Sequence, residues 1–191
     1  MLTEAAARWL LVLHTALGVA AVGAATHLVL WLRRVLRGEL GRLRAVRRFA
    51  WLVVALQLAA FAAGNAMYPT YKVEVRAAYL ENTTAVATDQ ESHQRALERV
   101  ATRDRAHPPA PTATGELVRR AAAAARWFDI KEHWIALGLL GSLGLVLVLA
   151  FWDPRTGREL APVILGLAAI VAATLWLGAV IGVMTASWRA V

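Results

Sequence analysis

Four long runs of apolar residues constrain the fold of this chain more than any other feature. They cover about residues 9–32, 49–68, 127–152 and 160–184 of the 191 in the sequence. A helix of roughly 20 such residues crosses about 30 Å of hydrocarbon, so each run is long enough to span a bilayer. Charged residues make up only 18% of the chain, less than a soluble domain of this length carries. The sequence therefore predicts an all-α integral membrane protein, a single membrane domain built as a bundle of four transmembrane helices.

The placement of arginine predicts how this bundle is oriented. The loop between the last two runs carries two arginines and two acids, whereas the loop between the first two carries seven arginines against Glu39 alone. Because positive loops stay in the cytoplasm, both short loops are expected there. Both termini and the segment 69–126 then face outward, into the periplasm if the membrane is a bacterial inner membrane. The seven arginines are Arg33, Arg34, Arg37, Arg42, Arg44, Arg47 and Arg48.

Net charge and cysteine content limit the partners and cofactors. The formal charge is +8, but the arginines flank apolar runs, which indicates contact with anionic lipid and no nucleic acid partner. The chain has no cysteine, which excludes disulfides, thiolate metal sites, iron–sulfur clusters and covalently attached haem. The expected partners are the lipid bilayer, other membrane subunits or further copies of the chain.

The outward segment 69–126 is predicted to be helical. Residues 89–105 place Ala96, Leu97, Val100 and Ala101 on one narrow apolar stripe, which is typical of an exposed amphipathic helix. A proline-rich run, residues 107–111, is expected to end it. Thr114 is the expected N-cap of the next helix, which meets no proline or glycine break between Glu116 and the third run. We therefore expect one long helix that begins outside the membrane and continues into it.

Polar side chains inside the apolar runs are costly in lipid and are functional candidates. Counted at about 1.5 Å per helical residue, several of them fall in one layer near the outward side. Tyr71 and Arg76 lie at the edge of this layer, beside the further charged residues Lys72 and Glu74. The layer itself contains His14, Asn65, Tyr68, Asp129, Glu132 and His133.

The histidines of this layer are candidate ligands. Asp129 precedes His133 by four residues, so the two share a helix face and the carboxylate is expected to orient the imidazole. The alternative is that Asp129 complements the helix dipole while His133 lies at the interface. For His14 the alternative is helix packing, with the imidazole bonded to a neighbouring carbonyl. His27 lies 13 positions from His14, at another depth, and is interpreted as a packing residue.

The first two runs resemble known membrane families. The residues that carry the resemblance are Leu13-His14-Thr15-Ala16-Leu17-Gly18, the arginine-rich turn, and Arg47-Arg48-Phe49-Ala50 at the start of the second run. They are similar to those of CopD-like copper-resistance proteins and cytochrome b561-like bacterial membrane proteins, over about a third of the chain. The resemblance implies a helical bundle that handles copper or haem b.

Three functions remain open on the sequence. The first is a redox protein in which His14 and His133 bind haem b or a transition-metal ion and electrons pass at the periplasmic side. In a metal site Asp129 and Glu132 are further ligands, and the supporting residues are Asn65, Tyr68, Tyr71 and Arg76. The second is a cofactor-free accessory or assembly subunit of a larger membrane complex. The third is a transporter of a metal ion or small solute. A stand-alone enzyme is not expected, because no nucleophile or substrate pocket is identifiable.

Overall fold

The computed structural model describes residues 2–105, 107, 110 and 112–188, and within these ranges it is helical with no strand. Two short 3₁₀ helices, η1 (Leu40–Arg42) and η3 (Arg158–Leu160), precede α2 and α5, and a π-helix, η2 (Tyr71–Leu80), continues α2. The long helices are α1 (Glu4–Leu36), α2 (Leu43–Thr70), α3 (Thr83–Asp104), α4 (Thr114–Phe151) and α5 (Ala161–Ala186).

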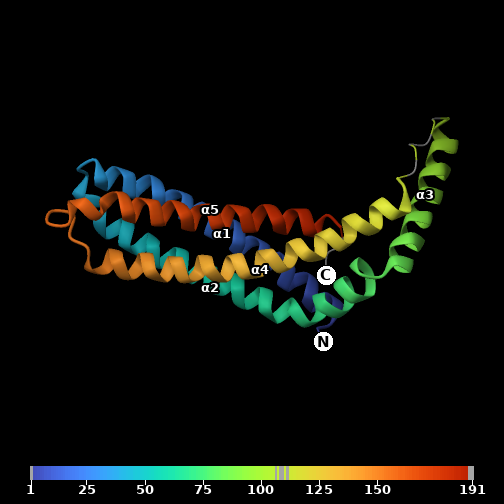
Figure 1. Cartoon of the computed structure of the whole chain (residues 1–191), viewed down its shortest axis with the longest axis horizontal. Coiled ribbons are helices and arrows are strands. Elements are labelled where there is room, and N and C mark those ends of the chain that lie inside the picture. The colour runs from blue at the N-terminus through green and yellow to red at the C-terminus, as the bar shows by residue number, and fades with distance from the viewer. Residues whose placement is uncertain (1, 106, 108–109, 111, 189–191) are drawn as a thin grey trace.

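Four of these helices lie side by side as an elongated bundle (Figure 1). Helix α1 packs against α2 and α5, and α4 packs against the same two, so α1 and α4 lie diagonally across the bundle. Four helices are long and apolar enough to cross a membrane: α1, α2 with its flanking η1 and η2, α4, and α5 with η3. The predicted all-α fold with four candidate spans is therefore confirmed.

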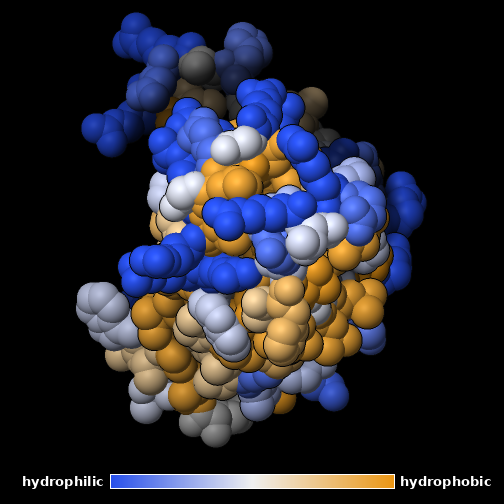
Figure 2. Space-filling view, turned by 90° about the vertical axis from the view of Figure 1, so that its left-hand side faces the viewer, coloured by the Kyte–Doolittle hydropathy of each residue, from blue (hydrophilic) through white to orange (hydrophobic). Residues whose placement is uncertain are grey.

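The bundle has two different ends. We call the end with the α1–α2 and α4–α5 loops the arginine end, and the opposite end, from which η2, α3 and the first part of α4 project, the α3 end (Figure 1). Figure 2 looks at the arginine end, where hydrophilic side chains lie over the tip and hydrophobic surface covers the sides. The half of the bundle behind this tip has an apolar core in which Leu28, Leu32, Leu145, Leu149 and Ile164 are at most 1% exposed.

The helices of the α3 end run further than predicted. Helix α2 does not stop near Tyr68 but passes through Pro69, which has no N–H to donate, and widens into the π-helix at Tyr71. Helix α3 begins at Thr83 because the Asn82 side chain accepts a hydrogen bond from the Ala85 N–H and caps it. Helix α3 ends at Asp104; Pro108, Pro109 and Pro111, which were expected to end it, lie outside the described residues.

Helix α4 confirms the predicted continuous helix of the third run. It extends over 38 residues without interruption, and its N-cap is Ala113, one residue before the expected Thr114. A second apolar cluster anchors its first part to η2 and to the start of α3. The buried members of this cluster are Tyr71, Val75, Tyr79, Leu80, Val86, Ala121, Ala124 and Ala125.

Candidate functional site

Contacts between helices show which polar residues lie at the same depth. Gly138 of α4 lies next to Thr174 of α5 and Gln57 of α2, which marks the middle of the bundle. About two turns towards the α3 end, Lys131 lies against α5 at Gly182. His14 of α1 lies against α2 over a similar distance from Gln57. His14 and Lys131 therefore belong to one layer of the bundle, inside its α3 half.

His14 makes a contact between two helices. Its Nδ1 lies 2.8 Å from the backbone oxygen of Ala60, and a Cβ at Gly64 would lie 3.2 Å from its Cε1. The bond to a neighbouring carbonyl that the packing interpretation expected is therefore present. No described residue is hydrogen-bonded to Nε2, so one ring nitrogen remains for another partner.

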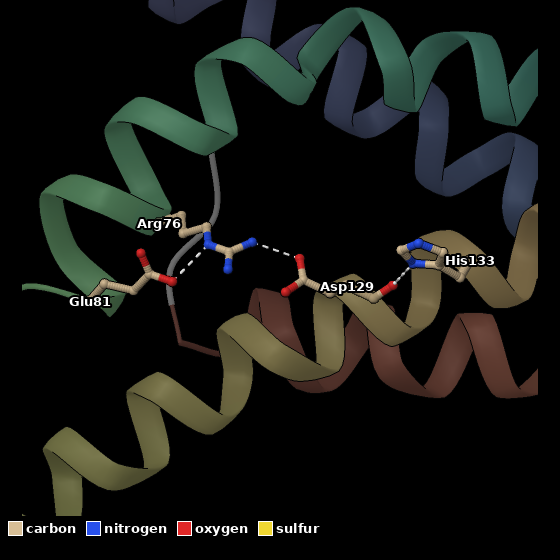
Figure 3. Close-up of polar contacts among 4 residues, drawn as sticks. All are labelled: Arg76, Glu81, Asp129 and His133. Atoms are coloured by element: carbon tan, nitrogen blue, oxygen red, sulfur yellow. Dashed lines mark hydrogen bonds and ion pairs between the residues drawn. The ribbon is translucent and has the colours of Figure 1, made fainter.

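The predicted hydrogen bond between the Asp129 carboxylate and the His133 imidazole is wrong, because His133 contacts the backbone oxygen of Asp129 and not its carboxylate. His133 Nδ1 lies 2.8 Å from the backbone oxygen of Asp129, and the Asp129 carboxylate accepts a 2.6 Å hydrogen bond from Arg76 (Figure 3). The four-residue spacing brought the residues together as predicted. The carboxylate binds the guanidinium because a charge-assisted bond is stronger than one to a neutral imidazole. The His133 ring itself is exposed.

Arg76 connects two elements at the α3 end. Besides Asp129 of α4, it donates a 2.8 Å hydrogen bond from Nε to Glu81, the residue after η2 (Figure 3). Its side chain is 24% exposed, against 38% for Asp129 and 47% for Glu81. The pair with Asp129 therefore fixes η2 on α4 and leaves this carboxylate occupied, whereas the pair with Glu81 is local to the end of η2.

Aromatic rings continue this contact towards Lys131. The rings of Tyr71 and Phe128 are stacked, with centroids 3.9 Å apart, and the Lys131 Nζ lies 5.6 Å from the Phe128 centroid. The Tyr71 hydroxyl is buried and has no hydrogen-bond partner in the described part of the chain. Tyr68 packs partly buried beside this cluster, whereas Asn65 is exposed.

The predicted metal ligands are not assembled into one site. Within the described ranges, no group of three or more His, Asp or Glu side chains is placed to hold a metal ion. Asp129 is paired with Arg76, and His14 and His133 come from the two diagonal helices. Glu132 is partly buried. His14 packs between α1 and α2, the His133 ring is exposed, and the described residues of α1 and α4 make no direct contact. A ligand held by both rings would have to bridge these two helices.

A buried polar layer in the middle of the bundle was not predicted as a unit. The Ser142 hydroxyl lies 2.5 Å from Gln57 Oε1 and 2.9 Å from the Gly138 carbonyl oxygen. Gln57 and Ser142 are each 2% exposed and Thr174 is 5% exposed. The signal in the sequence is the four-residue spacing of Gly138 and Ser142, which places both on one face of α4. This face also carries Lys131.

Comparisons of the chain with known proteins identify no family. No protein-family model, no curated protein and no solved structure matches it. The resemblance of the first two spans to CopD-like and cytochrome b561-like proteins stays an expectation, and the function is argued from the site.

Proposed function

We propose that this chain is a membrane-embedded redox protein that holds haem b through His14 and His133 near the periplasmic side. One observation carries the proposal: Nδ1 of each ring lies 2.8 Å from a backbone carbonyl oxygen. A carbonyl accepts a hydrogen bond, so the proton is on Nδ1 and the lone pair is on Nε2. This is the form in which a histidine binds iron, with its second nitrogen oriented by a backbone acceptor.

The donor set fits haem better than a bare metal ion. A metal site needs three or more protein ligands, and the described residues bring no such group together. Haem b needs two imidazoles, and helical bundles supply them from facing helices. When bound, haem supplies one-electron chemistry; His14 and His133 hold and orient it. The orientation with the α3 end outward rests on the arginines of the opposite end.

The distribution of polar groups favours a one-sided function over transport. Among the described residues, the buried polar side chains of the spans lie in the middle, at Gln57, Ser142 and Thr174, or at the α3 end, at Thr70. The buried core of the arginine half is built from Leu, Val, Ile and Ala with Trp152. A transported ion or solute needs polar groups on both sides of its binding site. Electron transfer at one membrane face needs no such route.

An optical spectrum tests the proposal. We expect detergent-purified protein, produced with haem available, to show the reduced α-band of haem b at near-stoichiometric level. His14→Ala and His133→Ala should each remove most of this band, because each removes an iron ligand. His27→Ala is the matched control: His27 is exposed and makes an edge contact with the Trp31 ring, with centroids 6.4 Å apart. A featureless wild-type spectrum, or full haem in either ligand variant, contradicts the proposal.

A second candidate, an accessory subunit of a larger complex, is favoured by α3. This helix of 22 residues projects from the bundle, and Val86 and Ala101 are its buried residues (Figure 1). An exposed helix of this length provides a surface for a partner subunit. Native gel electrophoresis of mild-detergent extracts tests it. We expect the chain to migrate in a complex that contains other proteins, and we expect deletion of residues 83–104 to abolish this complex. Migration at the size of the chain alone contradicts the role as a subunit.

A further inference from the structure

Lys131 lies on the inward stripe of α4. Ile135, Gly138 and Ser142 follow it by 4, 7 and 11 residues, spacings that keep all four side chains on one helix face. Gly138 and Ser142 are buried, and Ile135 packs against the core. The Lys131 ammonium points to α5, where a Cβ at Gly182 would lie only 3.2 Å from Nζ. A glycine at position 182 therefore leaves room for this ammonium group between α4 and α5.

This partly buried cation makes no ion pair with a described residue. No described carboxylate lies within the 4.0 Å of Nζ that defines an ion pair, and the contact that Nζ makes is with the Phe128 ring, 5.6 Å from its centroid. The nearest acids along the helix are Asp129, which is paired with Arg76, and Glu132, whose charge acts on Lys131 without an ion-pair contact. An ammonium partly removed from water with no acid in contact is costly, so an anion that reached it would be bound favourably.

The depth of Lys131 indicates which anion is available. Trp127 and Trp134 lie four residues before and three residues after it on α4 and are 47% and 42% exposed, and Trp9 of α1 is 75% exposed. Exposed tryptophans mark the interface between hydrocarbon and head groups. The anionic group at that depth is the phosphate of a lipid head group, and basic residues near the membrane surface bind such groups.

We propose that Lys131 binds a phosphate group, from an anionic phospholipid or free in solution, in the seam between α4 and α5 at Gly182. The Phe128 ring positions the ammonium from one side, and Gly182 keeps the seam open on the other. The contacts that define this site involve Phe128 and Gly182 and neither of the proposed haem ligands, so the proposal does not need haem to be bound.

Thermal unfolding of the full chain in detergent tests this site. The additions are phosphatidylglycerol, the zwitterionic phosphatidylcholine, or inorganic phosphate, and the readout is the shift in Tm with ligand concentration. The variants are Lys131→Met, Lys131→Arg, and the matched control Lys72→Met, which removes the other lysine of the chain, exposed on η2. Circular dichroism confirms that each variant is folded before titration.

We expect phosphatidylglycerol to raise Tm more than phosphatidylcholine in wild type, Lys72→Met and Lys131→Arg. Lys131→Met should weaken the apparent affinity by about five- to tenfold, the loss expected for one basic residue at a membrane surface. If inorganic phosphate alone gives a shift that depends on Lys131, the site binds free phosphate. Equal shifts in wild type and Lys131→Met for every addition, or no shift with any anion, overturn the proposal.

Discussion

The two ends of the bundle each contain a partly buried cation, and the two cations differ in the groups that they contact. At the arginine end, Arg47 of α2 donates to the backbone oxygens of Leu149 and Trp152, at 2.7 and 2.8 Å. These are carbonyls at the end of α4, which have no partner inside the helix. At the α3 end, Lys131 faces an aromatic ring and a glycine. A cation with its acceptors in place holds helices together, whereas one without them marks a place where something binds.

The largest effect is expected at the arginine end. Arg47→Met removes both hydrogen bonds and leaves two carbonyls unpaired, so it should lower the free energy of unfolding by about 3 kcal/mol. The measurement is unfolding in mixed detergent micelles. Arg48→Met is the control, because Arg48 is exposed, and it should change stability little. A small effect of Arg47→Met would mean that this end is not held by its buried cation.

The layer between the two ends should show the next largest effect. Gly138→Ala places a Cβ that overlaps Thr174 Cγ2, which should cost about 2 kcal/mol through overpacking. Adding Thr174→Ser removes that methyl group and should recover most of the loss. Gly144→Ala is the control, since among the described residues a Cβ there meets nothing within 4 Å beyond its chain neighbours and its own helix backbone. If the double variant is no more stable than Gly138→Ala, the contact between Gly138 and Thr174 does not set the distance between α4 and α5.

At the α3 end the ion pairs of Arg76 should contribute less. Arg76→Met breaks the 2.6 Å pair that fixes η2 on α4 and the 2.8 Å pair at the end of η2. These groups are partly exposed, so we expect a loss of about 1 kcal/mol in the free energy of unfolding. Hydrogen exchange should become faster in residues 71–80, and added salt should weaken the wild-type protection. Arg95→Met, which breaks an exposed pair within α3, should leave this protection unchanged. Equally faster hydrogen exchange in both variants would contradict a specific stabilisation of η2 by Arg76.

The sequence predicted those features of the helices that depend on residues close together in the chain. Four apolar runs give four long helices, and the absence of a break between Glu116 and the third run gives the continuous α4. The shared depth of residues near His14 and Lys131 follows from the rise per residue.

The contacts at the site differ from the predicted ones where elements distant in the sequence meet. The sequence spacing put Asp129 beside His133 but did not predict that Arg76 takes the carboxylate, because Arg76 arrives through a π-helix that begins after Pro69. A π-helix has i→i+5 hydrogen bonds and more residues per turn than an α-helix. The face on which Arg76 lies therefore does not follow from an α-helical repeat. The inward direction of Lys131 is readable from its spacing to Gly138, yet the lack of an acidic partner appears only in three dimensions.

The most direct test of the account compares the two buried cations in one assay. Arg47→Met and Lys131→Met are unfolded in the same detergent, free of added lipid and phosphate. We expect Arg47→Met to lower Tm and Lys131→Met to leave it unchanged or to raise it, because methionine replaces a charge that has no ion-pair contact with any described residue. Equal losses of stability in the two variants would show that Lys131 holds the bundle as Arg47 does, and would contradict a binding site at the α3 end.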